Sequence, residues 1–153
     1  ETSVLEDIGV PAQLEARFEV PSLWSGAGDV KSLPIGFDPI GLDQVAKESP
    51  ANRSSDVVLQ RPFAHDTVTT WKLPAGSYVP ELPGDILVEA EGVLGYEQQV
   101  RQVESGLEVR RRFQLHSHRI SLDNYAAFRD ALQQVRLAEQ RQIQIVVPNG
   151  DRP

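Results

Sequence analysis

The chain has 153 residues, enough for a single domain with a core of its own, and 40% of them are hydrophobic. Its formal net charge of −7 argues against a nucleic-acid partner, because phosphate binding needs a concentrated positive field. The absence of cysteine excludes disulfides, thiolate metal sites and a cysteine nucleophile from these residues.

The first part of the chain predicts a leading segment, a strand and an irregular region. Residues 1–12 lack the basic region of a signal peptide, and we interpret them as a linker or leading segment within an excised piece of a longer protein. Apolar and charged side chains alternate over 13–20, which predicts a half-buried strand. Turn-forming residues dominate 22–56, where we expect a short strand near 30–35 and an exposed loop over 38–56.

The middle of the chain is rich in strand signals. β-Branched and aromatic residues are frequent at 56–63 and 66–73, and in the second run Trp71 and Leu73 share a face, so we expect Trp71 in the core. Further strands are predicted at 85–92, 96–103 and 107–115, with a three-residue hairpin connection at 104–106. Arg111 interrupts the apolar face of the last strand, and we expect it at a sheet edge with its guanidinium in water.

The hydrophobic period changes after residue 120. Apolar residues recur at spacings of three and four over 121–141, which predicts an amphipathic helix with Ser121 as its N-cap. A final strand is expected within 142–147, before a disordered tail at 148–153. The strands show no βαβ alternation. We therefore predict a mainly β fold, a single antiparallel β-sandwich domain over 1–147 with one C-terminal amphipathic helix packed on it.

Two proline and glycine signals lie between these predicted strands. Leu82-Pro83-Gly84-Asp85 fits a type II turn, in which proline fixes φ at the second position and glycine supplies a positive φ at the third. The segment 74–76 predicts a comparable tight corner. We interpret the pair as scaffold corners that flank a short strand, rather than as a ligand-holding loop.

Few residues suggest a metal or ligand site. His116 and His118 would lie on one face of a strand, but zinc sites usually need three or four protein ligands, so we expect no metal. Trp24 lies in a loop beside a glycine and could stack on a ligand. We retain Trp24, His116 and His118 as a candidate ligand or partner surface.

The candidates for catalysis are weaker still. Glu89 and Glu91 share a strand face and could form an acid/base pair, although a solvated strand face explains them more simply. His65 and Asp66 are not accompanied by a G-x-S-x-G elbow, and no glycine-rich phosphate-binding motif occurs. We expect no catalytic residue, no cofactor and no enzymatic activity. No apolar run approaches the roughly 18 residues of a membrane-spanning helix, so we also expect no transmembrane segment.

An ordered set of short motifs begins at residue 61. The motifs are RPF at 61–63, WKLPAG at 71–76, ELPGD at 81–85, GY at 95–96, VRRRF at 109–113 and RISLDNYAAFR at 119–129. This order resembles, over about residues 61–145, the C-terminal β-rich region of large bacterial transglutaminase-like proteins, whereas residues 22–56 depart from that pattern.

The resemblance carries expectations about function. Proteins of that group are usually secreted or periplasmic, and uncharacterised β-domains flank their papain-like transglutaminase core. The catalytic Cys-His-Asp set belongs to that core, and no residue of it carries over to this cysteine-free chain. The resemblance thus implies a periplasmic or extracellular, non-catalytic accessory domain whose partner is the transglutaminase-like domain of the same parent protein.

A second hypothesis comes from another class of proteins. The chain could be a free-standing extracellular binding or adhesion domain, with a protein or a glycan as its ligand and with Trp24 on its binding surface. A hydrolase that uses Glu89 and Glu91 is the third and weakest alternative.

Overall fold

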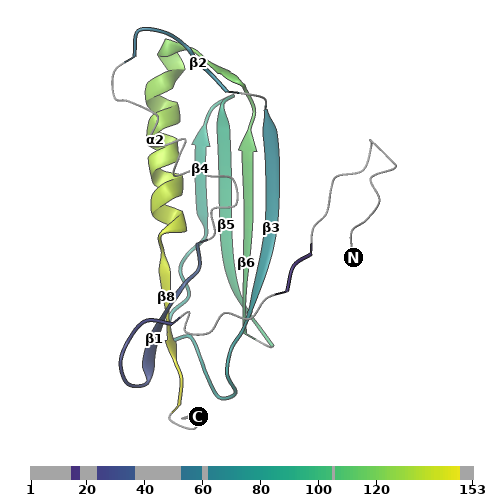
Figure 1. Cartoon of the computed structure of the whole chain (residues 1–153), viewed down its shortest axis with the longest axis vertical. Coiled ribbons are helices and arrows are strands. Elements are labelled where there is room, and N and C mark those ends of the chain that lie inside the picture. Colours follow the sequence, from purple (N-terminus) through teal and green to yellow (C-terminus); the bar gives the residue numbers. More distant parts are fainter. Residues whose placement is uncertain (1–14, 18–23, 37–52, 60–61, 105, 149–153) are drawn as a thin grey trace, which may run out of the picture.

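A computed structural model describes residues 15–17, 24–36, 53–59, 62–104 and 106–148. They form eight strands and one helix, labelled in Figure 1. The elements are β1 Val30–Pro34, β2 Val57–Val58, β3 Phe63–Lys72, β4 Ile86–Ala90, β5 Leu94–Val103, β6 Gly106–Leu115, β7 Arg119–Ile120, α2 Leu122–Glu139 and β8 Gln142–Val146.

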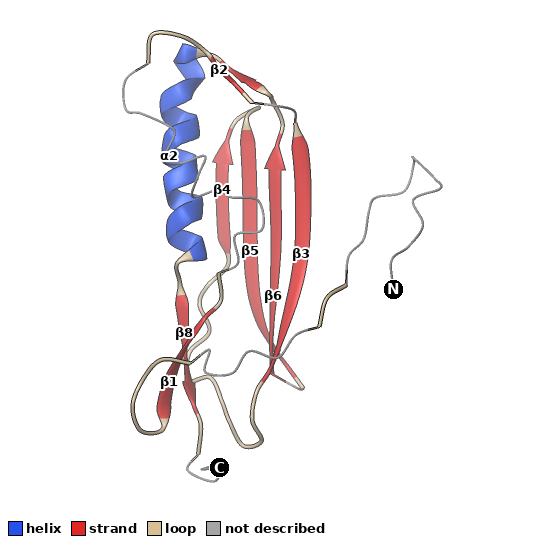
Figure 2. Cartoon of the chain, in the orientation of Figure 1, coloured by secondary structure: helices blue, strands red, loops and turns tan. Residues whose placement is uncertain are grey.

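A four-stranded antiparallel sheet is the largest layer of the fold. Its strand order is β3-β6-β5-β4, and two-stranded ribbons form from β1 with β8 and from β2 with β7. α2 lies along the β4 side of the sheet and contacts β4 and β5, while β3 forms the opposite border (Figures 1 and 2). The predicted mainly β fold, with antiparallel strands and one packed C-terminal helix, is confirmed.

The sheet has two faces of different character. We call the face that carries Val88, Tyr96 and Phe113 the inner face, because these side chains are buried in the core that includes α2. The opposite face, which carries Leu87, Glu97 and Arg112, is the outer face. The two faces follow from the alternation of side chains along each strand.

The core consists of two apolar clusters along the inner face. The upper cluster joins the sheet to α2, and the lower cluster joins it to the β1–β8 ribbon. The upper cluster contains Val88, Ala90, Val93, Leu94, Tyr96, Phe113, Leu115, Ile120, Tyr125, Phe128, Ala131, Leu132, Val135 and Ala138. The lower cluster contains Leu33, Ile35, Val100, Leu107, Val109, Ile143 and Ile145, with Trp24, Trp71 and Leu73 packed against it.

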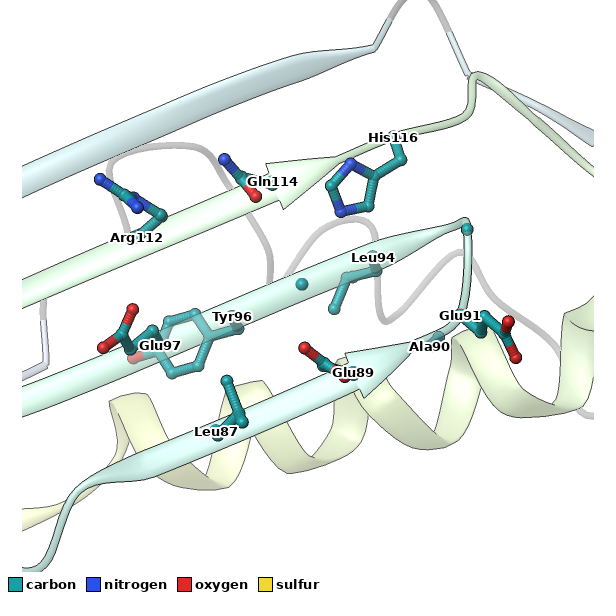
Figure 3. Close-up of a pocket in the computed structure, with 12 residues that line it drawn as sticks. Leu87, Glu89, Ala90, Glu91, Leu94, Tyr96, Glu97, Arg112, Gln114 and His116 are labelled. Carbon is teal, nitrogen blue, oxygen red and sulfur yellow. The ribbon is translucent and has the colours of Figure 1, made fainter.

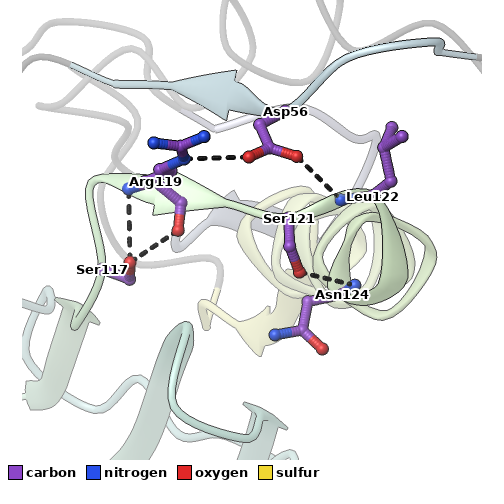
Figure 4. A network of polar contacts seen from close by, with 6 residues as sticks. All are labelled: Asp56, Ser117, Arg119, Ser121, Leu122 and Asn124. Atoms are coloured by element: carbon purple, nitrogen blue, oxygen red, sulfur yellow. Dashed lines mark hydrogen bonds and ion pairs between the residues drawn. The ribbon is translucent and has the colours of Figure 1, made fainter.

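α2 begins where the sequence predicts, at a doubly capped N-terminus. The Ser121 side chain accepts a hydrogen bond from the Asn124 amide, at 3.4 Å. The Asp56 carboxylate accepts a second hydrogen bond, from the Leu122 amide at 3.3 Å. It also forms an ion pair with Arg119 at 2.8 Å (Figure 4). A carboxylate at this position is favoured by the helix dipole. Asp56 therefore fastens the β2–β7 ribbon to the start of the helix.

Most of the predicted strands are confirmed, but the first one is not. Residues 15–17 of the strand predicted over 13–20 are exposed and belong to no strand, and the rest of it lies outside the described residues. Of the loop predicted over 38–56, residues 53–55 are exposed as expected, and 38–52 lie outside the described residues. Among the described residues, no helix combines the length and the apolar character needed to cross a membrane.

The hairpin between β5 and β6 is shorter than predicted. Val103 pairs with Gly106, so Gly106 already belongs to β6 and does not extend the connection to three residues. Gly106 has a φ of +150°, and a Cβ added there would lie 1.9 Å from the Trp71 carbonyl oxygen. The close approach of β3 requires a glycine at this position.

One predicted corner is confirmed, and the other is wrong. The Ser77 amide donates to the Pro74 carbonyl at 3.1 Å, and Gly76 has a φ of 78°, as a tight corner requires. Gly84 does not adopt a positive φ, so residues 82–85 form no type II turn. Asp85 instead makes a two-pronged ion pair with Arg101 of β5, at 2.5 and 2.6 Å, which holds this segment beside the sheet.

Replacement of Phe128 by alanine tests the packing of α2 on the sheet. Phe128 is 1% exposed in the upper cluster, so Phe128→Ala should lower the free energy of unfolding by about 3–5 kcal/mol. Leu137→Ala, on the exposed side of the same helix, should change it by about 0.5 kcal/mol or less. Urea unfolding followed by circular dichroism measures both, and equal losses would contradict this packing.

Two glycine substitutions test the backbone of the hairpin and of the rejected turn. Gly106→Ala should destabilise by about 2–3 kcal/mol, because the new methyl group meets the Trp71 carbonyl and the backbone is strained. Gly84→Ala should be neutral or stabilise by up to about 1 kcal/mol, because no atom lies within 4 Å of its Cβ. Thermal unfolding of both variants checks the difference; a strongly destabilised Gly84→Ala would restore the type II turn.

Candidate functional site

A buried polar cluster lies on the inner face between the two apolar clusters. It consists of Tyr96 and Gln98 of β5, Arg111 of β6 and Glu139 at the end of α2. Arg111 Nε lies 3.2 Å from Glu139 Oε1, and the two side chains are 5% and 11% exposed. The Tyr96 hydroxyl donates a hydrogen bond to the same carboxylate oxygen.

The position of Arg111 corrects the sequence-based expectation. Arg111 lies in β6, a central strand, and its whole residue is 6% exposed, so its guanidinium is not in water. The guanidinium is buried because Glu139 supplies the opposite charge from a distant part of the chain. A buried charge without such a partner would cost several kcal/mol.

Glu139 occupies an unfavourable place within its own helix. The C-terminal end of a helix carries partial negative charge and favours cations, and Glu139 is the last residue of α2. The contact with Arg111 offsets this repulsion. Burial, and then the adjacent Glu139 carboxylate, raise the pKa of the Tyr96 hydroxyl, so the phenol stays protonated as a donor.

This cluster is largely buried and links the helix to the sheet. Gln98 and Arg111 are buried, and the Arg111 guanidinium also donates to Thr69 Oγ1 of β3 at 3.4 Å. Gln98 Nε2 and Arg111 Nη2 are buried without a hydrogen-bond partner within the described part of the chain. We therefore assign the cluster a structural role, which joins the end of α2 to the middle of the sheet.

The accessible candidate site is a hollow in the outer face. Its volume is about 660 Å³, and it opens where Gly95 of β5 leaves a gap between Glu89 of β4 and Gln114 of β6, its two cross-strand partners. His116 borders the gap, because a Cβ built on Gly95 would lie 3.5 Å from His116 Nε2. Missing side-chain volume at one strand position therefore creates the hollow.

Charged and polar side chains surround this hollow. Glu89 and Glu97 line it on the β4 and β5 side, and Arg112, Gln114 and His116 line it on the β6 side (Figure 3). Glu97 accepts a hydrogen bond from Gln99 at 2.7 Å. Arg112 pairs with Asp66 of β3 at 3.1 Å. These groups can bind a polar partner through hydrogen bonds and charge.

The structure separates the three residues of the predicted surface. His116 lines the hollow. β6 ends at Leu115, so the strand alternation does not extend to His118, whose carbonyl accepts the Leu59 amide at 2.7 Å. Trp24 is half-buried and packs against the lower cluster. Trp71, which the sequence places in the core, is likewise partly buried against that cluster.

The structure also shows where the two candidate acids and the His65-Asp66 pair lie. Glu89 and Glu91 are exposed, and both line the hollow. His65 and Asp66 are neighbours on β3 and project from opposite faces, so they do not act as a pair. No group of three or more His, Cys, Asp or Glu side chains within the described ranges could hold a metal ion.

The sequence interpretation missed the residues that form the hollow. Gly95 stands inside a strand pattern, and a glycine in a strand interior often marks a close approach or a gap. That signal could have drawn attention to Gly95. Arg112 and Gln114 carry no such signal, because they read as ordinary exposed positions until Gly95 is placed beside them.

A known protein family matches most of the chain. The model of a family described as a domain of unknown function with a solved structure, DUF3858, matches residues 33–145. No curated protein matches the chain, and no solved structure does.

Tyr96→Phe tests the buried polar cluster through the pH dependence of stability. The folded-state pKa of Tyr96 is raised above the unfolded value of about 10. The contribution of Tyr96 to the free energy of unfolding is therefore complete below pH 10 and is lost as the pH rises above 10. At pH 7 the variant should lose about 1.5–3 kcal/mol with its hydrogen bond to the carboxylate. Between pH 9 and 11 its unfolding free energy should fall less steeply than that of the wild type.

Tyr78→Phe is the matched control for this experiment, because Tyr78 is exposed. It should leave the stability at pH 7 unchanged. Urea unfolding at a series of pH values measures the stability and its alkaline slope. An identical alkaline slope in the wild type and in Tyr96→Phe would refute the assignment.

Proposed function

The chain belongs to the DUF3858 family, and we propose that it acts as a non-catalytic accessory domain of a larger transglutaminase-like protein. In this role it docks on the cysteine-enzyme core of the same parent and positions that core or its substrate. The ordered motifs between residues 61 and 129 support the proposal, since they resemble the β-rich regions of that protein group and lie within the family match.

The observation that carries the proposal is the exposed outer face of the sheet. α2 and the β1–β8 ribbon pack on the inner face, whereas side chains of the outer face are exposed along β3, β4 and β6. Val68 and Leu87 on this face are 61% and 69% exposed. A face with exposed apolar side chains, polar groups and a hollow has the mixed character of an interface between domains.

The charge around the hollow indicates the chemistry of the docking partner. The carboxylates of Glu89, Glu91 and Glu97 line one side, and the one arginine among the lining residues, Arg112, pairs with Asp66 and lies opposite Glu97. A partner segment that carries lysine or arginine would complement this side. We therefore propose that a basic segment of the parent's enzyme core enters the hollow. We place the parent in the periplasm or outside the cell, as the resemblance implies.

The test uses the coding sequence that flanks this chain. We expect it to encode a domain with a Cys-His-Asp set, and we expect that purified domain to shift the amide NMR signals of Gly95, Glu97 and Gln114. Glu97→Lys, which reverses a charge at the hollow, should weaken the binding at least tenfold. Leu137→Ser, on the exposed side of α2, is the matched control and should leave the affinity unchanged.

Two results would count against this proposal. One is a flanking sequence without a cysteine-enzyme domain. The other is binding that Glu97→Lys and Leu137→Ser affect equally. Signals around Gly95 that shift with an oligosaccharide, and not with the flanking domain, would favour the alternative of a glycan-binding domain.

A further inference from the structure

The border strand β3 has one edge without a partner among the described residues. β3 is 10 residues long and pairs with β6 along its whole length on one side. Figure 1 shows it at the border of the sheet away from α2. Natural edge strands are usually protected by shortness, proline or a covering element. β4, at the other border, has only 5 residues and lies against α2, whereas β3 is longer, contains no proline and is covered by no helix or further strand among the described residues.

The hydrogen-bond pattern shows which residues face this free edge. The His116 amide donates to the Val93 carbonyl at 2.8 Å and continues the β5–β6 ladder. Even-numbered residues of β6 therefore bond β5, and its odd-numbered residues bond β3. Because odd residues of β6 pair with odd residues of β3, the even residues of β3 direct their backbone groups outward. They are Ala64, Asp66, Val68, Thr70 and Lys72.

We propose that β3 pairs antiparallel with β3 of a second copy of this chain, about a two-fold axis at Thr69. In this register Asp66 faces Lys72 of the second copy, and Lys72 faces its Asp66, so the sequence complements itself in charge. Val68 faces Thr70 of the second copy in the same way. These are the residues whose backbone groups point outward, so side-chain complementarity and hydrogen bonding agree on one register.

The neighbouring register is less favourable. An axis at Val68 would place Asp66 opposite Thr70 and Lys72 opposite Ala64, and neither charge would meet its opposite. With the axis at Thr69, the inner-face positions also pair well. Thr67 of one copy faces Trp71 of the other, and the two Thr69 residues face each other. Pairs of β-branched and aromatic residues are favourable across antiparallel strands. The product is an isologous dimer with one continuous sheet, which leaves the hollow at Gly95 accessible on both copies.

The first test measures association of the 153-residue chain by analytical ultracentrifugation over a range of concentrations. We expect a monomer–dimer equilibrium that Val68→Pro weakens at least tenfold, because proline removes an outward N–H and leaves the bonds to β6 intact. Leu87→Pro is the matched control, since Leu87 is an equally exposed, outward-directed position on β4. It should leave the dimer unchanged, and circular dichroism should show both variants folded.

The second test reverses one charge at a time. Asp66→Lys alone and Lys72→Asp alone each place like charges opposite one another and should be monomeric. An equimolar mixture should form a heterodimer, because both opposed pairs are then complementary again. If the mixture associates, the single variants fail to dimerise because like charges meet across the axis. The loss of the Asp66–Arg112 ion pair within one chain is then not the cause.

Three results would overturn the proposal. They are a chain that stays monomeric at every concentration, a dimer that Val68→Pro does not weaken, and a mixture of the two charge variants that does not associate.

Discussion

The ion pair between Arg111 and Glu139 is the constraint on which the arrangement of the layers depends. Arg111 lies in the middle of an otherwise apolar strand face, where its charge is tolerated only with an anionic partner. Glu139 is that partner, and it stands at the helix end where a carboxylate is least favoured. Each residue is unfavourable in its own element and acceptable only beside the other. The pair therefore specifies where α2 must end over the sheet.

The same pair divides the core and sets the places of the covering elements. On β5 the inner-face residues run from Tyr96 through Gln98 to Val100, from the upper apolar cluster across the polar cluster to the lower one. α2 covers the part above this division, and the β1–β8 ribbon covers the part below it. Both covering elements lie on the inner face. These two elements leave the outer face and the free edge of the border strand β3 uncovered.

The sequence predicted those parts of the fold that local patterns determine. α2 and its Ser121 cap follow from the helical period, and β6 follows from its alternation. Arg111 was misplaced because its burial depends on Glu139, which is distant in sequence and becomes a neighbour only when α2 packs on the sheet. The turn expected at Gly84 does not form. Pro-Gly permits a type II turn without imposing it, and here Gly84 lacks the positive φ while Asp85 pairs with Arg101 of β5.

The candidate site was predicted only in part, because it is a property of three adjacent strands. His116 was singled out from the sequence and does line the hollow, but Gly95 and Gln114 gain their meaning from the strand register alone.

The pairing of β1 with β8 depends on the same kind of long-range order, and it bears on synthesis of the chain. Val30 precedes the strands of the sheet in the chain, whereas its partner Val146 follows α2. The sheet and α2 can assemble before β8 has been made, whereas the lower cluster closes only afterwards, so closure of the β1–β8 ribbon is the last step in the assembly of these elements.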